Sequence, residues 1–251
     1  MKKFLVLLLF FIISYSLTGE NYIRLLQKDQ WGFLDSQGNI MIPAQFDYAG
    51  DFFEGYARVK KNGKWGFIDP SGKYTVKPQY DFVLEFSEGL AAVKKGKLWG
   101  YINPKGELII SHKYELCGNF FEGLAWIVVD KKYGFINQKG KTAIKPQFEM
   151  TGIFSEGLAW YKKEGLYGYI DKTGRKTIQA VFELAGNFNE GLAWIKINGK
   201  YGYINPKGKI VIDPVFEDAG DFQNGKSVVI VSEKYTIDKE GKKITSSDEE
   251  K

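Results

Sequence analysis

Two columns of carboxylates recur along the chain every 34 residues, and they are its first candidates for chemistry. The first column is Asp47, Asp81, Glu115, Glu149, Glu183 and Glu217; the second is Glu54, Glu88, Glu122, Glu156 and Glu190. Several converging carboxylates could bind calcium, and two acids about 5 to 10 Å apart could hydrolyse a glycan. Acids that repeat once per copy have similar environments, however. We therefore expect them to cap turn amides or to pair with lysines such as Lys64.

The other reactive residue types are nearly absent. The chain has one histidine, His112, in a column that holds proline in other copies, and one cysteine, Cys117, in a column of small residues. Neither has a recurring partner, and a lone histidine is weak evidence for catalysis. We expect no catalytic residue, no metal site, no cofactor and no enzymatic activity. A glycan-acting enzyme that uses Glu122 and Glu156, and a calcium-stabilised surface protein, remain as alternatives.

The 34-residue spacing is the strongest signal in the sequence. An aromatic residue followed by glycine occurs six times at this spacing, at Trp31, Trp65, Trp99, Tyr133, Tyr167 and Tyr201. A degenerate seventh copy begins at Tyr235, and every glycine after Gly19 occupies a repeat column. Glycine allows positive φ and close approach of a neighbouring backbone, so these columns indicate backbone geometry. The aromatic column itself is expected to pack between copies.

The local pattern predicts strands rather than paired helices. In the second copy, apolar and polar residues alternate over 57–60, an Asn-Gly pair at 62–63 predicts a hairpin turn, and a turn at 69–72 precedes a strand at 74–76. We predict an all-β fold over residues 20–245, built from seven three-stranded antiparallel meanders. The connections could add at most a short fourth strand. An open superhelical, solenoid-like array and a propeller-like ring both fit this pattern.

The repeat resembles the WG-repeat (KWG-type) family of bacterial proteins. The residues that carry the resemblance are KWGFIDPSGK at 64–73, PQYD at 78–81 and FSEGLA at 86–91. The resemblance covers about residues 20 to 245, with tyrosine for tryptophan in copies four to six and a decayed seventh copy. It implies a repeat scaffold with no assigned reaction.

The N-terminus has the order of a secretory signal peptide. Two lysines precede an apolar run at 4–13, and small or polar residues follow up to Gly19. The run is too short to span a bilayer as a helix. We expect a signal peptide at 1–19, a protein that is secreted or periplasmic with no stable membrane span after cleavage, and a polar tail at 246–251.

One column breaks the repeat and supplies the candidate binding residues. Opposite the alanine and valine core face of the first predicted strand, the copies carry Arg24, Arg58, Ala92, Trp126, Trp160, Trp194 and Val228. Three consecutive tryptophans would form an aromatic strip, typical of a surface that binds a partner, although tryptophan could also fill space between copies.

The composition agrees with a binding role and excludes others. The chain has 251 residues, of which 44% are hydrophobic and 26% charged, as in ordinary globular proteins. Its net charge of +5 is too small and too evenly spread to indicate nucleic-acid binding. We expect an exported, non-enzymatic scaffold that binds a protein or an envelope polysaccharide, with Trp126, Trp160, Trp194 and Arg58 as candidate contact residues.

Overall fold

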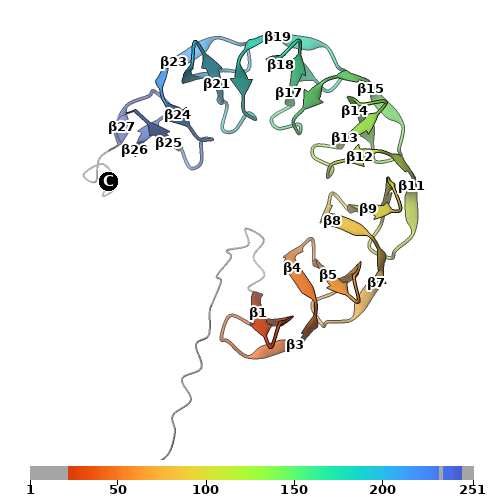
Figure 1. Ribbon diagram of the computed structural model, residues 1–251. Helices are drawn as coiled ribbons and strands as arrows, with labels where there is room; N and C mark the ends of the chain where they lie inside the picture. Colours follow the sequence, from red (N-terminus) through yellow and green to blue (C-terminus); the bar gives the residue numbers. More distant parts are fainter. Residues whose placement is uncertain (1–21, 232–233, 245–251) are drawn as a thin grey trace, which may run out of the picture. The chain divides into compact units, whose positions relative to one another are not determined.

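The computed structural model describes residues 22–231 and 234–244, which form 27 β-strands and no helix (Figure 1). The segment expected to be a signal peptide, 1–19, and the polar tail, 246–251, lie outside the described residues. Within the described ranges there is accordingly no helix that could cross a membrane.

The chain divides into two compact modules, an N-terminal module, Met1–Lys113, and a C-terminal module, Tyr114–Lys251. The N-terminal module contains three antiparallel sheets. The first is formed by β1 (Ile23–Gln27), β2 (Gln30–Leu34) and β3 (Ile40–Phe46). The second is formed by β4 (Tyr48–Phe53), β5 (Tyr56–Lys61), β6 (Lys64–Ile68) and β7 (Tyr74–Tyr80). The third is formed by β8 (Phe82–Ser87), β9 (Leu90–Lys95), β10 (Leu98–Ile102) and β11 (Leu108–Tyr114), and β11 ends at the module boundary.

The C-terminal module contains four antiparallel sheets of four strands each, with neighbouring strands in chain order. The first is formed by β12 (Leu116–Cys117), β13 (Leu124–Val129), β14 (Lys132–Asn137) and β15 (Thr142–Phe148). The second is formed by β16 (Met150–Thr151), β17 (Leu158–Lys163), β18 (Leu166–Asp171) and β19 (Lys176–Phe182). The third is formed by β20 (Leu184–Ala185), β21 (Ala193–Ile197), β22 (Lys200–Ile204) and β23 (Ile210–Phe216). The last is formed by β24 (Asp218–Ala219), β25 (Lys226–Ile230), β26 (Lys234–Asp238) and β27 (Lys243–Ile244).

The seven sheets confirm an all-β repeat built from antiparallel meanders. The connection that follows each meander was expected to add at most a short fourth strand, and it forms the first strand of the next sheet instead. This strand is six residues long in β4 and β8 and two residues long in β12, β16, β20 and β24. Six of the seven sheets in the described part of the chain therefore have four strands.

The third meander strand is also longer than the sequence indicates, because a bulge accommodates its proline. Trp65 pairs with Tyr80 and Phe67 pairs with Val76, so Pro78 lies where the ladder shifts register. Proline has no backbone N–H, and a bulge is a place in a strand where none is needed. Pro78 therefore lies inside β7 and does not end it.

The core lies between consecutive sheets of a module. The alanine column of the first meander strand (Ala57, Ala91, Ala125, Ala159 and Ala193) and the phenylalanine column of the connection (Phe52, Phe86, Phe120, Phe154, Phe188 and Phe222) are buried, as predicted. One cluster joins Phe67 and Val76 of the second sheet to Ala91 and Val93 of the third. Each sheet therefore depends on its neighbour for burial, as in other repeat proteins.

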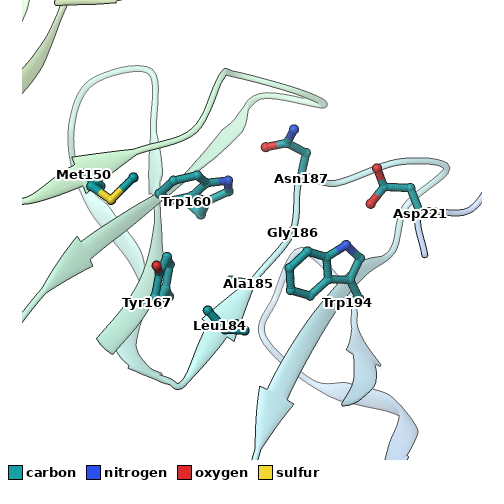
Figure 2. A pocket seen from close by; sticks show the side chains of 9 residues that line it. All are labelled: Met150, Trp160, Tyr167, Leu184, Ala185, Gly186, Asn187, Trp194 and Asp221. Atoms are coloured by element: carbon teal, nitrogen blue, oxygen red, sulfur yellow. The ribbon is translucent and has the colours of Figure 1, made fainter. Parts of the chain in front are cut away.

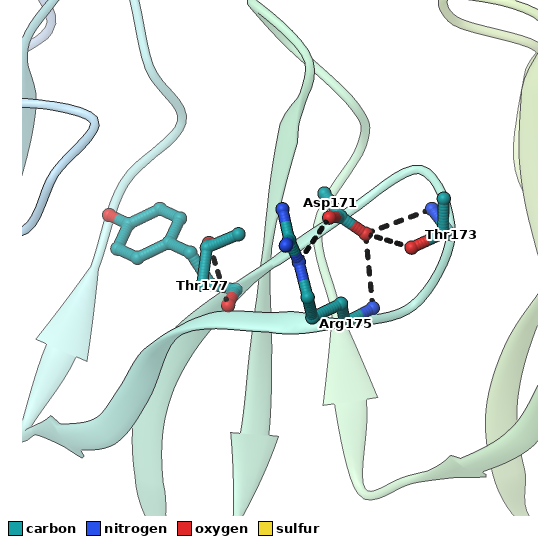
Figure 3. A network of polar contacts seen from close by, with 5 residues as sticks. Asp171, Thr173, Arg175 and Thr177 are labelled. Atoms are coloured by element: carbon teal, nitrogen blue, oxygen red, sulfur yellow. Dashed lines mark hydrogen bonds and ion pairs between the residues drawn. The ribbon is translucent and has the colours of Figure 1, made fainter.

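The loop between the second and third meander strands is fixed by its acid or amide residue. In the loop after β18, Oδ1 of Asp171 accepts hydrogen bonds from the backbone N–H groups of Thr173 and Arg175, both at 3.0 Å (Figure 3). The Thr173 hydroxyl donates to the same oxygen at 2.6 Å, and Nε of Arg175 lies 3.0 Å from Oδ2. These bonds hold the pKa of Asp171 below its ordinary value. Asp171 thus stabilises the backbone of its own loop.

Candidate functional site

Trp160 faces the space between its own sheet and the next, because side chains alternate along β17. Its neighbours Ala159 and Tyr161 are buried against the preceding sheet of the module. Trp160 instead packs against the core cluster of the following sheet. Trp126 and Trp194 hold the equivalent places, and all three side chains are half-buried. The tryptophans are therefore placed one per sheet, with part of each indole accessible.

Each of these indoles packs against a glycine in the connection that precedes its own strand. A Cβ atom built on Gly152 would lie 2.3 Å from Nε1 of Trp160, and one built on Gly186 would lie 2.3 Å from Nε1 of Trp194. The third tryptophan is seated in the same way. Separations this short are not allowed between real atoms, so a tryptophan can occupy this place only where the facing residue is glycine.

The residue type of the repeat aromatic changes together with that of the tryptophan column, the first-strand position that holds Trp126, Trp160 and Trp194. The tryptophan rings contact the tyrosine rings of the following strand at centroid distances of 5.5, 5.4 and 5.7 Å, in the pairs Trp126–Tyr133, Trp160–Tyr167 and Trp194–Tyr201. In the N-terminal module the repeat aromatic is tryptophan, and its neighbour on the first meander strand is arginine or alanine. Each of these sheets therefore has one indole at this place, contributed by one strand or by the other.

Two of the tryptophans border one hollow of about 380 Å³ in the C-terminal module (Figure 2). The lining residues are Met150, Trp160, Tyr167, Leu184, Ala185, Gly186, Asn187, Trp194 and Asp221. They come from three consecutive sheets, and most of them are aromatic or aliphatic. Apolar walls with a few polar groups are the usual composition of a ligand site.

The polar groups of the hollow are an amide and a carboxylate. The indole N–H of Trp194 donates a hydrogen bond to the carboxylate of Asp221. Asp221 is exposed as a residue, but its carboxyl group packs against Trp194, and this partial burial raises its pKa. The Oδ1 atom of Asn187 is buried and has no hydrogen-bond partner in the part of the chain that the structure describes. The acceptor that the hollow offers to a ligand is therefore the Asp221 carboxylate.

The structure brings together some of the residues expected to bind and separates others. Trp160 and Trp194 share the hollow, whereas Trp126 is not among its lining residues. Arg58 belongs to the N-terminal module and lines a different hollow, with Tyr48, Trp65 and Phe82 among its neighbours. The guanidinium of Arg58 is already paired there, at 2.8 Å from Oε1 of Glu85 and 5.5 Å from the Trp65 ring centroid.

The polar side of the site, Asn187 and Asp221, was not predicted from the sequence. Asp221 and Asn187 lie in a column that follows the first-strand position by 27 residues and reads Asp51, Glu85, Asn119, Ile153, Asn187 and Asp221. This column changes in charge along the chain, as the tryptophan column does. That change is the signal by which it could have been found.

A family model for a WG-containing repeat matches six consecutive segments, residues 31–65, 65–99, 99–133, 133–167, 167–201 and 201–235. These segments cover most of the chain. The chain belongs to the WG-containing repeat family. Each match starts at the repeat aromatic whose ring lies beside the first-strand column, so the hollow is bordered by a defining position of the WG repeat, Tyr167.

Solved structures similar to this WG-repeat chain are β-propeller-like. A eukaryotic initiation factor matches at 11% identity and a TM-score of 0.61, over 90% of this chain and 73% of that one. Kluyveromyces lactis Hsv2 with loop 6CD replaced by a Gly-Ser linker matches at 8% identity and a TM-score of 0.52, over 87% and 89%. The dihydro-heme d1 dehydrogenase NirN matches at 9% and 0.53, over 90% and 63%. Identities this low show the fold alone. A comparison with curated protein sequences found no match.

The first acidic column of the WG repeats caps hairpin turns. Asp81 accepts a 2.6 Å hydrogen bond from the backbone N–H of Gly96 and forms a 2.6 Å ion pair with Lys64. Glu149 accepts from the backbone N–H of Glu164 at 2.6 Å. The expected role in capping turns and pairing with lysine is confirmed for these residues.

The second acidic column caps a turn in the next WG repeat, rather than a local one. Glu54 accepts hydrogen bonds from the backbone N–H groups of Glu88 and Gly89, at 2.6 and 2.9 Å. Glu190 accepts in the same way from Asn224 and Gly225, at 2.6 and 2.8 Å. The partners lie 34 or 35 residues away, so each of these carboxylates joins two consecutive sheets.

Glu190→Gln is expected to lower the free energy of unfolding at pH 7, because an ionised carboxylate is the stronger acceptor. The Gly225 N–H and the other donors hold the pKa of Glu190 below its ordinary 4.5, so this stabilisation is present above pH 4.5 and is lost as the pH falls through the lowered pKa. Urea unfolding at pH 7 and at pH 3 to 4 measures it. Glu164→Gln, whose exposed carboxylate forms an ion pair with Lys163, is the matched control. A difference between wild type and Glu190→Gln that grows towards low pH would contradict the assignment.

The lone histidine and cysteine lie outside the hollow. His112 is in β11, with its ring centroid 6.2 Å from that of Tyr80, and burial lowers its pKa. Cys117 is buried in β12. Among the residues that the structure describes, no three histidine, cysteine or acidic side chains are grouped so that they could hold a metal ion.

Proposed function

We propose that this WG-repeat protein is an exported, non-catalytic scaffold that binds a protein or an envelope polymer at the hollow bordered by Trp160 and Trp194 in its C-terminal module. The observation that carries the proposal is the hollow in which Trp160 and Trp194 meet. It is bordered by a column in which the repeats differ from one another, and aromatic side chains with accessible faces are frequent anchors at binding surfaces. The signal-like N-terminal segment supports export.

The way the carboxylates are used supports a non-catalytic role. Glu122 and Glu156, the pair that a glycan-acting enzyme would need, each accept hydrogen bonds from a backbone amide of the following repeat, at 3.0 Å from Gly157 and 2.9 Å from Gly191. Each carboxylate is thus engaged with the backbone of the next repeat, and Glu122 also forms an ion pair with Lys172 at 3.0 Å. The repeated carboxylates are therefore better explained by folding than by hydrolysis.

The double variant Trp160→Ala with Trp194→Ala should reduce binding of the protein to envelope material by about tenfold or more, since each truncation removes an aromatic contact worth over 1 kcal/mol. Immobilised wild type and variant are compared for capture from envelope fractions that have been separated into protein and polysaccharide. The fraction that is captured identifies the partner class.

Trp126→Ala is the matched control, because it removes an indole from the equivalent place in a sheet without touching the hollow. It should reduce capture much less than the double variant does. Far-UV circular dichroism establishes that all variants are folded. Equal capture by wild type and by a folded double variant would refute the proposed surface.

A further inference from the structure

In the first two sheets of the N-terminal module, an arginine of the first meander strand pairs with the carboxylate that follows it by 27 residues. Arg24 lies with its guanidinium carbon 5.6 Å from the Trp31 ring centroid and its Nε atom 3.0 Å from Oδ1 of Asp51. In the next sheet, Arg58 lies in the same way between Trp65 and Glu85. The arginine thus stacks on the indole of its own sheet and neutralises a carboxylate that follows it by 27 residues.

In the C-terminal module the carboxylate is retained and the arginine is absent. Asp221 follows Trp194 by the same 27 residues, but the first-strand residue is now the tryptophan itself. Trp194 donates a neutral N–H to Asp221, and in the described part of the chain no lysine or arginine forms an ion pair with this carboxylate. A partly buried carboxylate without a cation carries an unfavourable desolvation cost, in keeping with its raised pKa.

The chemistry of the hollow matches a guanidinium group. Its walls are the aromatic side chains of Trp160, Tyr167 and Trp194, on which a planar cation can stack. Its accessible acceptor is the Asp221 carboxylate, and Asn187 lines the hollow with it. A guanidinium carries five N–H donors in a fixed plane and is more weakly hydrated than an ammonium. A neutral sugar would leave the carboxylate charge without a counterion.

We propose that the hollow binds an arginine side chain of a partner protein, so that a guanidinium from outside stacks on the aromatic walls and pairs with Asp221. The partner then supplies the group that Arg24 and Arg58 supply within the N-terminal module. This inference rests on the proposed function and names the chemistry that the partner presents.

The test uses N-acetyl-arginine N-methylamide and its citrulline counterpart, which has the same shape but no charge. Each compound is titrated into the purified protein, and binding is followed by NMR chemical-shift changes and by tryptophan fluorescence. We expect the arginine compound to bind at least tenfold more tightly than the citrulline compound, and Asp221→Asn to remove that preference. Trp126→Ala should leave both affinities within about twofold of wild type.

Equal binding of the arginine and citrulline compounds to the wild-type protein would overturn the inference, without reliance on any variant. Binding of a neutral chito-oligosaccharide that Trp160→Ala abolishes and the arginine compound does not displace would also overturn it, and would indicate a sugar site. If the tryptophan double variant loses capture of envelope material while arginine shows no preference, the arginine inference fails and the proposed function stands. If capture is also unchanged, both fail.

Discussion

Gly168→Ala is expected to destabilise the C-terminal module by about 3 kcal/mol, because the added methyl group has no space. A Cβ atom at this position would lie 2.5 Å from the carbonyl oxygen of Ile178, 2.6 Å from the carbonyl carbon of Gln179 and 2.7 Å from the backbone nitrogen of Ala180. All three atoms belong to the backbone of β19 at its bulge, so no side chain can rotate to relieve the contact. Urea unfolding, with hydrogen exchange across β18 and β19, measures the loss.

Gly165→Ala is the matched control in the hairpin turn before β18. Gly165 has a φ of +81°, and no atom lies within 4 Å of the position of its Cβ. Alanine there should lower the free energy of unfolding by about 1 kcal/mol, the cost of placing a residue with a Cβ atom in the left-handed region. The difference between the two variants isolates the steric cost at the bulge. Equal losses would show that β19 can move away, and that the glycine after the repeat aromatic is not required for strand approach.

The sequence was sufficient to predict those features of the fold that depend on contacts within one meander. The Asn62-Gly63 turn, the alternation from Ala57 to Lys60 and the glycine after each repeat aromatic depend on contacts within one meander, and all agree with the structure. The buried alanine and phenylalanine columns were predictable for the same reason, since a strand with one apolar face must place that face in the core.

Contacts between sheets were not predictable from local periodicity. Glu190 reaches Asn224 and Gly225 in the next sheet, and the connection strands join the sheet that follows rather than the one that precedes. The hollow is of the same kind, because Trp160, Asn187 and Asp221 come from three consecutive sheets. The repeat position of a residue predicts which face of its strand it occupies. The packing of one sheet on another decides which of these positions come into contact.

The side-chain sizes at two facing positions of a sheet, one on the connection strand and one on the first meander strand, vary together. The third sheet of the N-terminal module has Leu84 where the tryptophan-bearing sheets have glycine, and Ala92 where they have tryptophan. A large residue on one strand therefore accompanies a small residue on the other. The glycine–tryptophan form places the indole of the first meander strand beside the next sheet, where Trp160 and Trp194 border the hollow.

Gly152→Leu alone should destabilise the C-terminal module by about 3 kcal/mol, because its side chain would enter the space of the Trp160 indole, whose Nε1 lies 2.3 Å from the position of the Cβ atom. Trp160→Ala alone should cost about 2 kcal/mol, roughly half the loss for a fully buried tryptophan. Independent effects would add to about 5 kcal/mol in the double variant.

The double variant should instead lose only about 2 kcal/mol, since it reproduces the Leu84 and Ala92 pair that the chain already contains. Urea unfolding of wild type, both single variants and the double variant measures a coupling free energy, expected to be about 3 kcal/mol. The double variant should also lose binding of the arginine compound, because Trp160 lines the hollow. Additive losses would mean that the two columns vary independently, and that stability did not restrict where a tryptophan, and with it a hollow, could arise.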